Sequence, residues 1–245
     1  MILDVDLSQI EWRIVAELTQ DPVMLREIQS GVDQHADTCT SVDMMNMPLT
    51  KENRTNAKLF NFRAIYANPH TASYAYFMDE KLPNFSKKRW EAIMQGFFSK
   101  YEGMGRVHSE WIKEVRQTGR LVGPTGRIWN FQKHPMKDGS KDYKVTQIRN
   151  YPVQGTAGDV IKMALVQIRK KLLKQYPHAL MVMTVHDSLI FDLARDYEEV
   201  ARICIETFNQ IPELMLRYFN WEMSVPIDGE AELGINWAST KELIV

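Results

Sequence analysis

Short apolar stretches bounded by polar or turn residues predict several strands along this chain. Leu3 to Asp6 favours a short buried strand at the start. Residues 180–185 and 188–191 each favour a strand, and the polar pair between them predicts a hairpin. A second hairpin is predicted over 119–129, where glycine and proline separate short apolar pieces. The segment 224–236 again favours strand.

Longer stretches carry apolar residues at helical spacing. A helix is predicted from about Lys51 to Tyr66, and further helix over residues 86–117. The clearest helix is expected from Thr156 to Gln175, where a capping box at Thr156 marks its start. Tyr197 to Phe219 predicts one long amphipathic helix. Strands at the start, late middle and end, with a mainly helical insertion, predict an α+β fold.

Charge is unevenly distributed along the 245 residues. The formal net charge of −1 argues by itself against a nucleic-acid-binding protein. Residues 86–150, here called the basic block, nevertheless hold 14 Lys and Arg against 6 Asp and Glu, while the remainder holds 16 against 25. The block suits a face that grips phosphates, and it equally suits a solvated helical face of mixed charge.

Composition excludes other classes of protein. No apolar run approaches the roughly 20 residues that span a bilayer. The first residues lack the basic region and cleavage site of a secretion signal. Cys39 and Cys204 lack metal-site spacing, so they are expected to be free thiols of the core in a reducing compartment, the cytoplasm.

Two aspartates follow apolar strand stretches that are far apart in the sequence. If Asp6 and Asp187 meet on one sheet, their carboxylates suit a two-metal site for phosphoryl transfer. Magnesium prefers a few carboxylates plus substrate phosphate oxygens to a cage made of protein alone. Either aspartate taken alone is more typical of a turn or cap than of a metal site.

The predicted helix over 51–66 carries a regular series of side chains. Arg54, Lys58, Phe62 and Tyr66 recur every four residues, with cations first and aromatic rings after them. Cations near a helix N-terminus favour phosphate, and aromatic faces favour base stacking. A simple amphipathic helix with solvated Arg and Lys is the alternative.

These segments resemble the motifs of family A DNA polymerases, in the family's order and spacing. Asp6 to Arg13 resembles motif A (D-x-S-Q-I-E-x-R), Arg54 to Tyr66 resembles motif B (R-x3-K-x3-F-x3-Y), and Val185-His186-Asp187 resembles the core of motif C. Further segments similar to the family are Asp33-Gln34-His35, Phe97 to Tyr101, and Asn150 to Ala157.

The resemblance implies a right-hand polymerase fold without a thumb: an antiparallel palm sheet with helices, plus helical fingers. The palm would comprise residues 1–22 and 154–245, and the fingers residues 23–153. The implied function is template-directed DNA synthesis on primer–template DNA from dNTPs, with two Mg²⁺ ions as cofactors and no membrane partner.

The resemblance also implies roles for individual residues. Asp6, Asp187 and the Leu7 carbonyl would hold the two Mg²⁺ ions. Lys58 would also donate a proton to the leaving pyrophosphate. The residues implied to contact the nucleotide are Gln9, Glu11, His35, Arg54, Lys58, Phe62 and Tyr66, with Glu11 blocking a ribose 2′-hydroxyl. The residues implied to contact DNA are Arg63, Asn150, Gln154 and His186.

Three positions depart from the family pattern. Arg63 and Ala67 replace the usual glycines of motif B, and Arg63 is expected either to contact or to crowd the template strand. Ser188 replaces the usual acidic residue after His-Asp in motif C. Phage-type single-subunit RNA polymerases have His-Asp-Ser there, so an RNA polymerase is a rival function. The Ser-Gln-Ile-Glu sequence and the position of Phe62 favour DNA synthesis.

Only five residues precede Asp6, whereas family members carry a thumb and usually an exonuclease-like domain before motif A. We therefore expect a split polymerase whose N-terminal half, with the thumb and any exonuclease, is a separate polypeptide. A phage gene, with its product in the host cytoplasm, would suit such a split. This hypothesis predicts an exposed apolar surface. A gene fragment, a non-catalytic DNA-binding or partner-binding remnant and a nuclease are the alternatives.

Overall fold

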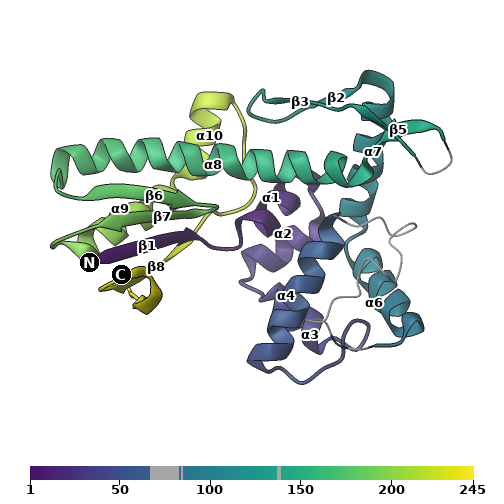
Figure 1. Cartoon of the computed structure of the whole chain (residues 1–245), viewed down its shortest axis with the longest axis horizontal. Coiled ribbons are helices and arrows are strands. Elements are labelled where there is room, and N and C mark those ends of the chain that lie inside the picture. Colours follow the sequence, from purple (N-terminus) through teal and green to yellow (C-terminus); the bar gives the residue numbers. More distant parts are fainter. Residues whose placement is uncertain (67–82, 84, 137–138) are drawn as a thin grey trace. The chain divides into compact units, whose positions relative to one another are not determined.

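The computed structural model describes residues 1–66, 83, 85–136 and 139–245, and Ala67 lies outside them (Figure 1). The chain divides into two compact units. The sheet unit comprises residues 1–14, 123–127 and 154–245, and the helical unit comprises residues 15–122 and 128–153. Together they contain helices and strands in the mixture that an α+β fold requires, which confirms the expected fold class.

A five-stranded antiparallel sheet, in the order β6-β7-β1-β8-β9, forms the centre of the sheet unit (Figure 1). The strand predicted at the start and the predicted hairpin at 180–191 are both confirmed. The strands are β1 (Ile2–Leu7), β6 (Leu180–Val185), β7 (Ser188–Asp192), β8 (Gly229–Gly234) and β9 (Lys241–Glu242). A short 3₁₀ turn, η1 (Trp237–Ser239), lies between the last two.

One face of the sheet packs on α9 (Tyr197–Asn209). Leu3, Val5 and Leu7 of β1 are buried, because alternate side chains of a strand point to the same face. Gly229 is required opposite the α9 ring of Phe208: a Cβ at Gly229 would stand only 2.4 Å from that ring. Burial of these apolar side chains fixes β1 and β8 against the helix.

The predicted single helix over 197–219 is wrong, because the structure has two helices there. α9 ends at Asn209, and α10 (Ile211–Phe219) begins after Gln210. Pro212 stands in the first turn of α10, where its missing N–H is harmless, but it cannot extend the hydrogen bonding of α9. The proline therefore starts a new helix.

The predicted start of the late helix at Thr156 is also wrong. α8 (Val145–Gln175) starts eleven residues earlier, contains Pro152, and buries Thr156 completely within it. Ile148 and Val153, on either side of the proline, are fully buried. Tertiary packing of these apolar residues outweighs the local cost of a proline inside a helix.

Helices dominate the helical unit. They are α1 (Ile10–Thr19, which begins in the sheet unit), α2 (Pro22–Gln29), α3 (Gln34–Thr40), α4 (Lys51–Tyr66), α6 (Lys87–Lys100) and α7 (Glu102–Thr118). Two small hairpins follow, β2 (Arg120–Val122) with β3 (Ile128–Asn130) and β4 (Lys133–Pro135) with β5 (Lys141–Tyr143). The predicted bounds of α4 and the hairpin predicted over 119–129 are confirmed.

The helix predicted over 86–117 is divided at Tyr101 into α6 and α7. The Tyr101 ring packs edge-on against Phe97 with the centroids 4.9 Å apart, and its hydroxyl donates to Glu27. Asp21 accepts the Met104 N–H in the first turn of α7, over a distance of 3.1 Å. A Cβ at Gly103 would clash with Asp21, so this close approach requires glycine. The new helix start is therefore fixed by a side chain far away in the sequence.

Cys39 and Cys204 are buried free thiols, as the sequence predicts. Within the described residues, no helix is long and apolar enough to cross a membrane.

Candidate active site

Asp6 lies in the middle of the sheet, on the face opposite to the buried side chains of β1. In the strand register Asp6 is paired with Ser188 of β7 on one side and with Glu230 of β8 on the other. The Ser188 hydroxyl donates a hydrogen bond of 2.7 Å to the Asp6 carboxylate. The residue that departs from the motif C pattern thus holds the motif A aspartate in place.

Asp187 lies in the tight turn between β6 and β7, beside the end of β1. His186 has a positive φ of 54°, which lets the chain reverse within two residues. The Leu7 N–H donates to the Asp187 carbonyl over 3.3 Å. The turn therefore brings Asp6, Leu7 and Asp187 together, although about 180 positions separate the two motifs in the sequence. His186 is exposed at the tip.

The surroundings of Asp6 oppose its ionisation. Burial raises the pKa of Asp6 most, and the charges of Asp187, Asp4 and Glu230 raise it further. The hydrogen bond from Ser188 lowers it, and the result is a pKa of about 6. Like charges gathered in a half-buried place repel one another, and a bound cation would relieve that repulsion.

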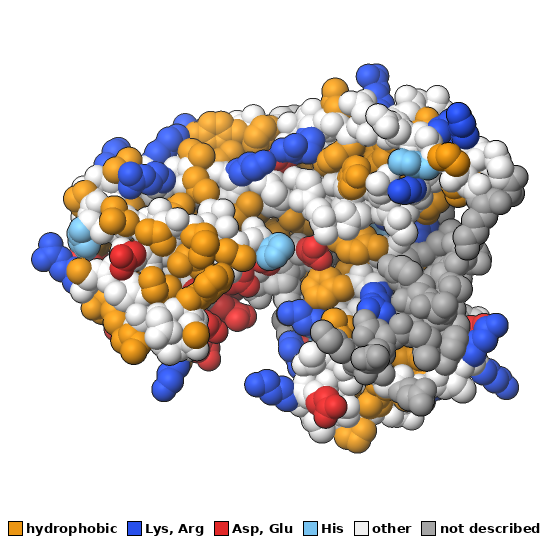
Figure 2. Space-filling model, viewed as in Figure 1, with side chains coloured by type: hydrophobic (Ala, Val, Ile, Leu, Met, Phe, Trp, Pro, Cys, Tyr) orange, Lys and Arg blue, Asp and Glu red, His pale blue; other side chains and the backbone are white. Residues whose placement is uncertain are grey.

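Glu230 is the residue at this site that the sequence analysis missed. Asp4, Asp6, Glu230 and Glu232 occupy alternate positions of the paired strands β1 and β8, so they share one face of the sheet. Figure 2 shows acidic side chains gathered beside the sheet. The alternation of Glu230 and Glu232 is visible in the sequence, but the register that places them beside β1 is not.

The donor set fits magnesium. Among the residues that the structure describes, no group of three or more His, Cys, Asp and Glu is arranged to enclose a metal ion. Mg²⁺ needs no such cage, since one or two carboxylates complete its shell together with water and substrate phosphates. Asp6 and Asp187 are two carboxylates that could serve in this way, and the raised pKa of Asp6 marks a place where positive charge is favourable.

Gln9, Glu11 and Gln154 also belong to the sheet unit. Gln9 turns the chain from β1 into α1 with a φ of 51°. Arg13 holds the turn by donating to the carbonyls of Ser8 and Pro226, over 2.8 and 2.6 Å. Glu11 stands in the first turn of α1, where Gln154 of α8 donates to it over a long 3.5 Å. Asn150 lies one helical turn before Gln154.

A second group of predicted residues meets in the helical unit, where α3 packs on α4. Asp33 caps α3 by accepting the N–H groups of His35 and Ala36, and its other oxygen accepts from Arg54 over 2.6 Å. The Lys58 ammonium lies 5.8 Å from the Phe62 ring centroid. Arg54, Lys58 and Phe62 thus share the exposed side of α4 with the end of α3.

His35 is buried and uncharged at neutral pH. Burial lowers its pKa most, and the charges of Arg54 and Lys58 help to lower it to about 4. Its Nδ1 lies 3.0 Å from the Asn61 side-chain nitrogen, and its ring centroid lies 6.0 Å from that of Phe62. Neutral His35 can offer a hydrogen bond to a phosphate but no charge. Arg63 and Tyr66 are half-buried in the last turn of α4.

The model of DNA polymerase family A matches residues 1–239. The chain belongs to this family. The DNA polymerase I of Aquifex aeolicus (strain VF5) is 28% identical over 234 residues, which are 95% of this chain and 38% of that protein. The thermostable DNA polymerase I of Thermus aquaticus is 26% identical, over 99% of this chain and 27% of that protein. The chain therefore spans between about a quarter and two fifths of these family members.

A solved structure has a similar fold. It is described as the POL domain of Pol1 from M. smegmatis in complex with DNA primer–template and dNTP. The TM-score is 0.76 at 21% identity, over 96% of this chain and 40% of that one. The fold of this chain is therefore similar to part of that polymerase domain.

Replacing Asp6 with Asn should stabilise the chain, more at pH 8 than at pH 5. The folded pKa of about 6 lies above the ordinary 3.8, so the folded state loses stability as the pH rises through this window. The uncharged amide removes the loss and still accepts from Ser188. The expected gain at pH 8 in EDTA is about 1 kcal/mol after allowance for solvent screening, or about 2–4 °C in Tm.

Thermal unfolding of both proteins at both pH values measures this gain. Asp192→Asn, at the exposed other end of β7, is the matched control. A gain for Asp6→Asn that is equal at the two pH values would contradict the electrostatic explanation.

Proposed function

We propose that the chain is the fingers and palm portion of a template-directed DNA polymerase, which adds dNTPs to a primer 3′ end. The palm comprises residues 1–22 and 154–245, and the fingers residues 23–153. The observation that carries this proposal is the proximity of Asp6 and Asp187, the motif A and motif C aspartates. Asp6 pairs with Ser188 at the start of β7, and Asp187, in the turn just before it, accepts from the Leu7 N–H. Family membership supports it.

Asp6, Asp187 and the Leu7 carbonyl are the residues that would hold two Mg²⁺ ions. Such ions, when bound, neutralise developing charge on the attacking and leaving oxygens. The protein itself contributes positioning. The Ser188 hydroxyl orients the Asp6 carboxylate before substrate arrives, and the Leu7 N–H fixes the backbone of Asp187 beside it.

The exposed side of α4 would bind the incoming nucleotide. Arg54 and Lys58 would contact the triphosphate, with Lys58 placed to donate a proton to the leaving pyrophosphate. Support comes from the Asp33–Arg54 hydrogen bond, which fixes the guanidinium yet leaves further N–H groups for phosphate oxygens. His35 would add a neutral hydrogen bond. Phe62 would pack on the sugar and base of the incoming nucleotide, and Tyr66 would stack at the templating position.

Glu11, with Gln9 beside it, would exclude ribonucleotides by blocking the 2′-hydroxyl. The primer–template would be contacted by Asn150, Gln154, His186 and Arg63.

An RNA polymerase is the second candidate function, because Ser188 gives this chain the His-Asp-Ser sequence of phage-type enzymes. The Ser-Gln-Ile-Glu sequence that contains Glu11, and the position of Phe62, favour DNA synthesis.

We further propose that a separate polypeptide supplies the thumb and any exonuclease. Support comes from the edge strand β6, where Leu180, Val182 and Met183 are 53%, 55% and 42% exposed. An exposed apolar edge strand favours association with another chain.

Asp187→Asn should abolish primer extension, by more than about 100-fold, because positioned charge carries most of the catalysis. The assay uses a short primer–template, Mg²⁺ and dNTPs, with Asp192→Asn on the same hairpin as the control that retains activity. If the chain alone is inactive, the assay is repeated with a candidate N-terminal half. Extension that persists in Asp187→Asn would refute the proposed site.

Glu11→Ala should raise ribonucleotide incorporation by about tenfold or more, since removal of a steric block of one hydroxyl is worth at least about 1.4 kcal/mol. The measurement is the ratio of rNTP to dNTP incorporation. Glu198→Ala, at an exposed position of α9, should leave the ratio unchanged. An unaltered ratio in Glu11→Ala would contradict the role of Glu11 and strengthen the RNA polymerase candidate.

A further inference from the structure

The basic block contains a helical face that the proposed active site does not use. On α7, side chains at helical spacing line one side of a groove: Glu102, Arg106, Ser109, Lys113, Arg116 and Gln117. The other side of α7 is apolar, with Met104, Val107 and Val115 buried. α7 therefore packs through one face and presents a polar, largely cationic face to the groove.

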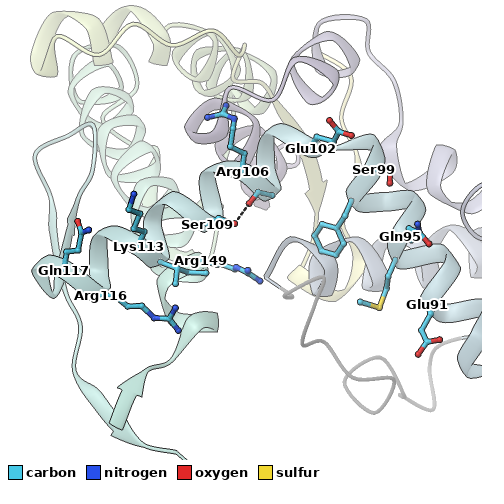
Figure 3. A pocket seen from close by; sticks show the side chains of 14 residues that line it. Glu91, Gln95, Ser99, Glu102, Arg106, Ser109, Lys113, Arg116, Gln117 and Arg149 are labelled. Carbon is cyan, nitrogen blue, oxygen red and sulfur yellow. Dashed lines mark hydrogen bonds between the residues drawn. The ribbon is translucent and has the colours of Figure 1, made fainter. Parts of the chain in front are cut away.

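The groove between α6 and α7, here called the α6–α7 groove, is large. It encloses about 1210 Å³, and Figure 3 shows its lining side chains coming from α6, from α7 and, at Arg149, from the first turns of α8. Small-molecule pockets usually enclose roughly 300–1,000 Å³. The size favours a polymer over a single metabolite, and the position between two helices favours a narrow strand over a duplex.

Positive charge exceeds negative charge in the lining. Arg106, Lys113, Arg116 and Arg149 face the groove, against Glu91 and Glu102. Arg106 pairs with Glu110 at 3.0 Å, and both side chains are about 60% exposed. Arg116 pairs with Asp142 at 2.6 Å. Exposed pairs of this kind contribute little, so phosphate groups can compete for these cations.

Arg149 gives the groove a built-in cation. It is only 3% exposed, yet it belongs to the groove lining, and Figure 3 shows it between the side chains of α6 and those of α7. Burial of a guanidinium is costly and contributes little to stability by itself. The nearby His108 is fully buried, and burial together with the charge of Arg149 lowers its pKa to about 3. His108 is therefore neutral, and Arg149 is the buried charge of this wall.

The α6 wall supplies surfaces for bases. Phe98 is half-buried and lines the groove together with Met94, while Ile112 lies on the α7 side. Proteins that bind single strands without sequence preference combine cations for the phosphates with aromatic faces on which bases stack. Arg106 and Arg116 are ten residues apart, so the cationic row is about 15 Å long.

We propose that the α6–α7 groove binds single-stranded nucleic acid, with phosphates along Arg106, Lys113 and Arg116 and bases against Phe98. This site consists of residues other than those assigned to nucleotidyl transfer. It explains the basic block as a phosphate-binding surface instead of a solvated face of mixed charge.

The test is fluorescence anisotropy of a labelled twelve-residue oligothymidine with the whole chain, in EDTA and without dNTPs. Arg106→Gln/Lys113→Gln should weaken binding about tenfold and reduce the salt slope by about 1.4, since each lost phosphate contact accounts for about 0.7. The matched control is Lys88→Gln/Lys141→Gln, which removes the same charge from exposed positions of the same unit outside the groove. It should change affinity less than twofold.

A variant that binds more tightly provides a second test, because misfolding of the double variant would also weaken binding. Gln117→Lys adds a cation to the lining and should tighten binding about threefold, whereas Gln175→Lys at the end of α8 should not. Equal affinities of the groove variant and the control variant would overturn the proposal. Equal competition by an unlabelled twelve-base-pair duplex, or by inorganic pyrophosphate, would overturn the assignment to single strands.

The same assay separates this site from the proposed polymerase function. Asp187→Asn should lose primer extension but keep oligothymidine binding. Loss of binding in Asp187→Asn would place the oligonucleotide at the carboxylates and refute the groove.

Discussion

The like charges around Asp6 are the constraint on which the sheet unit depends. Apolar burial on α9 fixes β1 between β7 and β8, and that register necessarily sets Asp6 between Ser188 and Glu230. The turn at His186 then adds Asp187. A fold selected for stability alone would avoid this repulsion, which helps to raise the pKa of Asp6. The arrangement is explained if a divalent cation and its phosphate ligands complete the site.

In the proposed function the helical unit has the opposite requirement, which is to hold cations that can bind phosphates. In the α3–α4 pair, Asp33 fixes Arg54, while Lys58 stays exposed beside Phe62. In the α6–α7 groove, Arg149 is buried and the α7 cations are exposed. The positive excess of the basic block corresponds to the α6–α7 groove, whereas Arg54 and Lys58 lie outside the block, in the part of the chain with an excess of negative charge. The formal net charge of −1 shows neither the positive nor the negative excess, because the two nearly cancel.

Local patterns in the sequence predict much of this structure. β1, the β6–β7 hairpin and both ends of α4 follow from alternation, spacing and turn residues close by. The division at Tyr101, the start of α8 before Pro152 and the position of Glu230 could not be predicted, because each depends on a distant partner. Asp21 fixes the start of α7. The burial of apolar side chains on both sides of Pro152 keeps α8 helical across the proline. The register of β1 and β8 places Glu230 beside Asp6. The resemblance to the family motifs identified Asp6 and Asp187 as candidate residues. Their neighbours became known only from the register of β1 with β7 and β8.

Divalent-ion binding in the absence of nucleotide tests most directly the claim that Asp6 and Asp187 form one cation site. Titration of Mn²⁺ into the whole chain, followed by the electron paramagnetic resonance of free Mn²⁺, counts the bound ions. The account predicts that Asp6→Asn and Asp187→Asn each weaken this binding at least about tenfold, while Asp192→Asn does not, because paired carboxylates dominate affinity for hard cations. Unchanged Mn²⁺ binding in both site variants would contradict it.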